Sequence, residues 1–138
     1  SRFNEEVTNG LLQGAMKFLR EVDSTPSSAD IFTAPGAFEM PLIAQQLAQT
    51  GLYNGVICLG CVIKGDTAHF EFISLGATVG IMQASLNTET PITFGVLTTY
   101  TDEQAIERSR NDAHNKGIEA AKACFESAKL LGRIAELQ

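Results

Sequence analysis

The chain has 138 residues, of which 44% are hydrophobic and 19% charged, and its formal net charge is -6. This length and composition are typical of one compact domain covering residues 1–138, and they exclude a disordered chain. The acidic balance, without a cluster of Lys and Arg, excludes a nucleic-acid surface, because phosphate backbones are bound mainly through cationic side chains. We therefore expect small molecules and other subunits as partners.

Neither a membrane span nor a disulfide is expected. No apolar run approaches the roughly 20 residues that cross a bilayer, and the first residues lack a signal-peptide pattern, so we expect a cytoplasmic protein. Cys58, Cys61 and Cys124 are an odd number of cysteines in a chain with enough apolar residues for a core. A separation of three in a strand would put Cys58 and Cys61 on opposite faces. Buried small hydrophobes are thus favoured over a redox or metal pair.

Apolar periodicity predicts helices in the first part of the chain. Helical spacing predicts one helix at residues 4–21 and a second at residues 38–48. Between them we expect a short strand at about residues 30–33, followed by a turn at Pro35-Gly36.

The second part alternates between apolar runs and helical patterns. Residues 55–63 are apolar nearly throughout, which is typical of a strand covered on both faces of a parallel sheet. A helix is predicted from the residues after Thr67 to about residue 87, and a further buried strand at residues 91–98. Thr101 and Gln104 match a capping box, so a helix begins there, and the last helix covers about residues 115–131.

This alternation predicts an α/β fold, a three-layer sandwich with helices on both faces of a parallel sheet. The chain opens directly in a helix, so either a first strand is absent or another element covers that edge. Ligands collect at the carboxyl ends of strands in such sheets. The segments to search are therefore residues 34–39, 60–69 and 98–108.

His69 is the strongest catalytic candidate in these segments. It stands after Gly65-Asp-Thr-Ala68 in the first turn of a predicted helix that follows a buried strand. Because histidine titrates near neutrality, it suits general acid and base work. The alternative is a helix-start histidine that only bonds to a neighbour. His114, in a polar stretch, is interpreted as a solvated loop residue.

Residues 65–67 could bind a phosphate through free backbone N–H groups at a helix start, although they match no Walker loop or dinucleotide fingerprint. Arg108 and Lys116 could supply the cations, although surface cations are ordinary. Glu39 could accept bonds from a hydroxyl-rich ligand or merely favour a helix dipole. Phe3 is expected to be exposed unless it packs on a ring.

Six segments, in this order, together resemble the lumazine synthase family. They are Arg2-Phe-Asn4, Pro35-Gly-Ala-Phe-Glu-Met-Pro41, Gly60-Cys-Val-Ile-Lys-Gly-Asp-Thr-Ala-His-Phe-Glu71, Phe94-Gly-Val-Leu-Thr98, Glu103-Gln-Ala-Ile-Glu-Arg108 and Asn115-Lys-Gly117. Any one could arise by chance, but the set runs through nearly the whole chain and is highly specific.

The resemblance implies a transferase of riboflavin biosynthesis with a flavodoxin-like sandwich. The family joins 5-amino-6-ribitylaminouracil to 3,4-dihydroxy-2-butanone 4-phosphate, giving 6,7-dimethyl-8-ribityllumazine, phosphate and water, without a cofactor or metal. The resemblance further implies a homopentamer or an icosahedral shell, with riboflavin synthase as a protein partner. His69 would transfer protons.

The resemblance also implies which residues bind the substrates. The pyrimidine and its ribityl chain would contact Phe3, Ala37, Phe38, Glu39, Cys61, Val62 and Ile63. The phosphate would lie at Asp66 and Thr67, with Arg108 supplying charge. Phe94, Arg108 and Lys116 would reach the site from a neighbouring subunit.

Alternative functions are left open by the residues. A non-catalytic flavin or lumazine carrier, or a shell protein, could share the fold, although it would not need His69, Arg108, Glu39 and Phe3 together. A flavodoxin-like electron carrier also fits the fold class, but the chain start lacks a Ser/Thr-rich phosphate loop.

Overall fold

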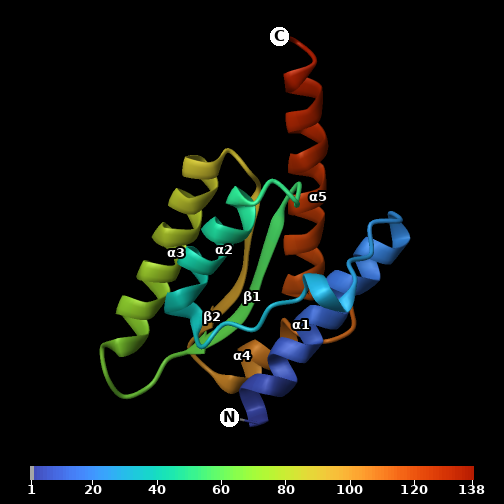
Figure 1. The fold of residues 1–138 in the computed structure, drawn as a ribbon. Helices are drawn as coiled ribbons and strands as arrows, with labels where there is room; N and C mark the ends of the chain where they lie inside the picture. Colours follow the sequence, from blue (N-terminus) through green and yellow to red (C-terminus); the bar gives the residue numbers. More distant parts are fainter. Residues whose placement is uncertain (1) are drawn as a thin grey trace.

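A parallel sheet lies between layers of helices in the computed structural model, which describes residues 2–138 and the side chains from Asn4 onward. Strand β1 (Val56–Ile63) pairs with β2 (Ile92–Thr99) in a parallel register from Val56 opposite Ile92 to Ile63 opposite Thr99. Helices α2 and α3 cover one face, and α1 and α5 cover the other (Figure 1). The predicted α/β class and the parallel sheet are confirmed.

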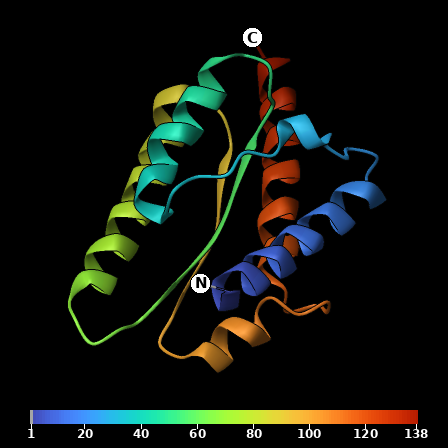
Figure 2. The same ribbon diagram turned by 60° about the horizontal axis from the view of Figure 1, so that its bottom comes forward.

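The predicted helices are confirmed, with small shifts of their ends. They are α1 (Arg2–Glu21), α2 (Met40–Gln49), α3 (His69–Thr88), α4 (Asp102–Glu107) and α5 (Lys116–Ala135). Short 3-10 turns, η1 (Ser28–Asp30) and η2 (Ala37–Glu39), lie between α1 and α2. Figure 2 shows α4 beyond the carboxyl end of β2 and close to the start of α1. None of the described helices combines the length and apolar character that a membrane crossing needs.

The prediction of a strand at residues 30–33 is wrong. Asp30 instead closes η1, where its carboxylate accepts a bond from the backbone N–H of Ser27 at 3.0 Å. Ile31 after it is extended, but residues 31–34 belong to no strand, and β1 pairs only with β2 among the described residues. A parallel strand needs a neighbour about 4.8 Å away. Here residues 31–37 and β1 instead line a cleft of about 1360 Å³. Residues 31–34 therefore have no neighbouring strand, in the part of the chain that the structure describes, with which to form backbone hydrogen bonds.

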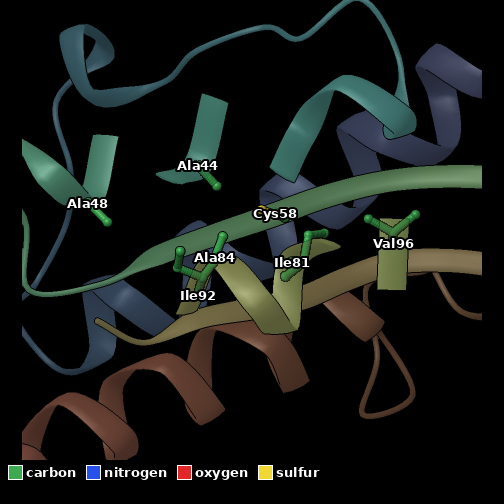
Figure 3. Close-up of a cluster of buried hydrophobic side chains, with 7 residues drawn as sticks. All are labelled: Ala44, Ala48, Cys58, Ile81, Ala84, Ile92 and Val96. Atoms are coloured by element: carbon green, nitrogen blue, oxygen red, sulfur yellow. The ribbon is translucent and has the colours of Figure 1, made fainter. Parts of the chain in front are cut away.

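The core consists of apolar clusters on the two faces of the sheet. Between the sheet and helices α2 and α3 lie Ala44, Ala48, Cys58, Ile81, Ala84, Ile92 and Val96 (Figure 3). On the opposite face, Val7, Leu11, Leu97 and Ala105 form a second cluster. Cys58 belongs to the first cluster and Cys61 packs against the second, which confirms that alternation along β1 separates these thiols.

Candidate active site at the carboxyl edge of the sheet

The ends of both strands are tied to the start of α3. Lys64, which follows β1, donates its backbone N–H to the carbonyl of Thr99 at 2.8 Å. The Lys64 ammonium lies 5.6 Å from the centre of the Tyr100 ring, within cation–π range. The Tyr100 ring in turn lies 6.0 Å from that of Phe70, in the first turn of α3. These contacts gather the connections after both strands at one edge of the sheet.

His69 is the first residue of α3, as predicted, and its side chain is exposed at this edge. Its backbone N–H donates to the hydroxyl of Thr67 at 3.4 Å. Asp66 and Thr67 are also exposed, directly before the amino terminus of a helix of 20 residues. Free N–H groups and the positive end of the helix dipole favour an anion at this place. The imidazole therefore stands next to a turn that can take a phosphate.

The η2 turn brings Ala37, Phe38 and Glu39 against α3. A Cβ added to Gly76 would stand 3.0 Å from the Phe38 ring, so the bare backbone of α3 allows the ring to lie close. Ala37 packs against the core cluster, whereas Phe38 and Glu39 remain exposed. This turn thus presents an aromatic face and a carboxylate to the solvent beside α3.

The last residues of β1, Cys61, Val62 and Ile63, are half-buried. Burial, and next the negative charge of Asp102, raise the pKa of the Cys61 thiol to about 11. A thiol with this pKa is protonated at neutral pH and is a weak nucleophile. Cys61 is therefore suited to line a pocket and not to react in one.

Arg108 and Lys116 lie next to each other. The Lys116 backbone N–H donates to the carbonyl of Arg108 at 2.8 Å. The Arg108 guanidinium donates to the carbonyl of Gln104 at 3.1 Å, and the Lys116 ammonium pairs with Glu119 at 3.2 Å. Within the described part of the chain, neither cation makes a hydrogen bond or ion pair with His69 or with residues 65–67.

Phe94 is the other described residue of the predicted site for which the structure shows no contact with His69. Phe94 lies in the middle of β2, half-buried, and lines an apolar hollow of about 310 Å³ together with Met82 and Leu86 of α3. The side chain of Phe3 lies outside the described residues. Within one chain, His69 and Thr67 are in direct contact, and η2 with Glu39 packs against α3, the helix of His69, at Gly76. Phe94, Arg108 and Lys116 make no hydrogen bond or ion pair with them among the described residues.

Sequence reasoning missed Tyr100 and Asn115. Tyr100 connects the end of β2 to α3, and no sequence signal distinguishes it from an ordinary loop aromatic. Asn115 is 1% exposed, and its side-chain oxygen accepts from the backbone N–H groups of Gly117 and Ile118 at the start of α5. An Asn directly before a helical pattern is a recognised N-cap signal and could have identified this role.

Known proteins with similar sequences identify the family of this chain. The family model described as 6,7-dimethyl-8-ribityllumazine synthase matches residues 1–132. The chain is 64% identical to 6,7-dimethyl-8-ribityllumazine synthase 1 of Caulobacter vibrioides, over 99% of this chain and 89% of that protein. It is 47% identical to the 6,7-dimethyl-8-ribityllumazine synthase of Salinibacter ruber, over 96% of this chain and 85% of that protein. The chain therefore belongs to the 6,7-dimethyl-8-ribityllumazine synthase family.

Proposed function

We propose that this protein condenses 5-amino-6-ribitylaminouracil with 3,4-dihydroxy-2-butanone 4-phosphate to give 6,7-dimethyl-8-ribityllumazine, phosphate and water. The observation that carries the proposal is the edge at which both strands end, in a chain of this family. That edge presents an imidazole, an anion-favouring turn and an aromatic–carboxylate turn, namely His69, residues 65–67 and η2. These groups match an amine–ketone condensation in which a phosphate leaves.

The chemistry requires proton transfers more than covalent help from the protein. The amine attacks the ketone, the adduct loses water to give an imine, phosphate departs, and ring closure loses a second water. His69 would accept and return protons during these steps, since imidazole works near neutral pH. Holding both substrates together would supply much of the remaining acceleration, without a cofactor.

The two substrates would be held by different parts of the edge. Glu39 would accept hydrogen bonds from the ribityl hydroxyls, Phe3 and Phe38 would lie against the pyrimidine, and Cys61 would line its pocket with Val62 and Ile63. The phosphate oxygens would accept hydrogen bonds from the backbone N–H groups around Asp66 and Thr67. The Asp66 carboxylate would turn outward to solvent, where it is now exposed.

The cations for the phosphate would come from a neighbouring subunit. In one chain, Arg108 and Lys116 make no hydrogen bond or ion pair with residues 65–67, among the described residues. The outer face of α3 also carries an exposed apolar stripe of the kind that marks subunit interfaces. Its members are Phe72, Leu75, Val79, Met82 and Leu86. Self-association into a homopentamer or a larger shell would cover this stripe, and Phe94 beside it.

A cytoplasmic location is part of the same proposal. The cysteines Cys58, Cys61 and Cys124 are all free thiols, which suits a reducing compartment.

The decisive experiment is to incubate the protein with both substrates and to follow the fluorescence of the lumazine product. Activity is expected in wild type, and Arg108→Ala should raise the Michaelis constant for the butanone phosphate about ten- to a hundredfold, through loss of a charge-assisted bond. Arg108→Lys should rescue only partly, because an ammonium cannot grip two phosphate oxygens. No product from wild type would refute the proposed reaction. Equal changes for both substrates would assign Arg108 to the interface.

A further inference from the structure

Asn115 is a buried polar junction between α1, the loop before α5, and α5 itself. Its side-chain amide donates to the carbonyl of Gly10 at 3.0 Å and to that of Arg110 at 2.8 Å. Its side-chain oxygen accepts from the backbone of Gly117 at 2.8 Å and of Ile118 at 3.2 Å. Both donor hydrogens and both acceptor positions of this amide are thus occupied, in a side chain that is 1% exposed.

The bonds of Asn115 fall into a donor half and an acceptor half with different effects. The acceptor half caps the first turn of α5, which is a local role that Asp, Ser or Thr can also play. The donor half is not local, because one of its bonds joins Asn115 to the backbone of α1 at Gly10, 105 positions away along the chain, while the other holds the loop at Arg110. Of the two halves, the donor half is the one that bonds the loop to α1.

The loop before α5 packs closely against α1, and this packing restricts the position of the loop. A Cβ on Gly14 of α1 would collide with the Asn115 side chain, and a Cβ on Gly117 would collide with the carbonyl oxygen of Leu11. Two glycines therefore let Asn115 and the first turn of α5 press against the backbone of α1. In packing this close, an added volume of even one methylene group has a measurable effect on stability.

The cations of the proposed phosphate site stand at the two ends of the same loop, Arg108 after α4 and Lys116 at the start of α5. Lys116 directly follows Asn115, and its backbone N–H donates to the carbonyl of Arg108 at 2.8 Å. This bond fixes Arg108 relative to Lys116, and the bond from Asn115 to Gly10 fixes both residues relative to α1.

We propose that Asn115 is a positioning residue for phosphate binding, which acts by tethering the loop with Arg108 and Lys116 to α1 through its two side-chain donors. The inference rests on the proposed function, in which these cations bind the phosphate of the butanone substrate. A misplacement of about 1 Å in such a contact can cost up to a hundredfold in rate.

The test uses the assembled enzyme and the variant Asn115→Asp. Aspartate is nearly isosteric and keeps the acceptors that cap α5, but it has no amide hydrogens for the carbonyls of Gly10 and Arg110. The Michaelis constant for the butanone phosphate should rise about tenfold or more, while that for the pyrimidine changes less than about threefold. Asn115→Ala loses both halves without placing a buried carboxylate opposite the carbonyls of Gly10 and Arg110, and it should show the same rise. Both variants should lower the melting temperature.

Asn111→Asp is the matched control, because it adds the same charge to the same loop at an exposed position. We expect it to leave both Michaelis constants within about threefold of wild type. An unchanged constant for the butanone phosphate in Asn115→Asp would overturn the inference, since capping alone would then be the role of Asn115. Equal rises in Asn115→Asp and Asn111→Asp would overturn it as well, because the cause would be charge.

Arg108→Ala separates this inference from the proposed function. If Arg108→Ala leaves the constant for the butanone phosphate unchanged, the proposed phosphate role of the loop fails. If Arg108→Ala raises that constant and Asn115→Asp does not, only the positioning role of Asn115 fails.

Discussion

Replacement of Gly117 by alanine should loosen the contact between α1 and α5. The new Cβ would collide with the carbonyl oxygen of Leu11 and stand 2.7 Å from its carbonyl carbon. Ordinary contacts between carbon atoms are about 3.5–4.0 Å, so the helices must separate by roughly 1 Å at this point. The obstructing atoms belong to the backbone of a residue that is 0% exposed, so no change of rotamer can relieve the clash.

The expected cost lies at the upper end of the range for overpacked cores, about 3 kcal/mol. The gain in helix propensity is small here, since Gly117 lies in the first turn of α5. For a chain of this size the cost corresponds to a melting temperature roughly 10 °C below that of wild type. The measurement is thermal unfolding followed by circular dichroism, at one protein concentration because assembly shifts the apparent stability.

Gly132 provides the control within the same helix. A Cβ at Gly132 meets no described atom within 4 Å, and alanine in a helix interior is favoured over glycine by about 1 kcal/mol. Gly132→Ala should therefore raise the melting temperature by a few degrees. If Gly117→Ala melts within about 2 °C of wild type, the inferred close packing of α5 on α1 is wrong. The argument that this packing fixes the loop position would then fail as well.

The remaining predictions concern catalysis, assembly and pH. His69→Ala should lower the turnover number about a hundredfold or more while leaving the oligomer intact, as measured by product fluorescence and light scattering; an unchanged rate removes His69 from the mechanism. At concentrations of the butanone phosphate well below its Michaelis constant in Arg108→Ala, co-assembly of the impaired His69→Ala and Arg108→Ala chains should restore wild-type activity at about one site in four, and mixtures no more active than the separate variants would place the whole pocket within one chain. Burial raises the pKa of Cys58 from 9.0 to about 12, so its contribution to stability is complete below pH 9 and is lost as the pH rises toward 12. Above pH 9, the free energy of urea unfolding should then fall less steeply with pH in Cys58→Ala than in wild type, and the two slopes should differ by roughly 1 kcal/mol per pH unit. Identical slopes would contradict the claim that burial raises the pKa of the Cys58 thiol.

The helices and the two sheet strands could be predicted because each carries a complete local signal. Apolar residues at helical spacing define α1, and their burial follows that pattern, with Val7 and Leu11 at 1% and 0% exposure. Residues 55–63 and 91–98 are too short and too uniformly apolar for surface helices. The predicted capping box also identified the start of α4, where the Thr101 hydroxyl accepts from the N–H of Gln104 at 3.2 Å.

The strand predicted at residues 30–33 failed because a strand is not a local property. Its sequence has the apolar character, but pairing depends on a neighbour that sequence periodicity does not reveal. The role of Asn115 was missed for the same reason. Its N-cap position could be read from the sequence, but its bond to Gly10 joins parts of the chain that only the fold brings together.

The distribution of charge explains why the proposed site should need a second subunit. Around His69 the exposed carboxylates are Asp66 and Glu71, and the nearby cation Lys64 lies over the Tyr100 ring. A phosphate approaching residues 65–67 would meet N–H groups but little positive charge from this chain. Arg108 and Lys116 stand on a loop that Asn115 ties to α1, so the loop cannot swing toward its own His69 without breaking buried bonds. The bonds that hold this loop against α1 would, on the proposed assembly, also orient Arg108 toward the neighbouring chain. On the proposed assembly, subunit association therefore completes the phosphate site, and the apolar stripe of α3 and the cations of the loop would serve one arrangement of neighbours.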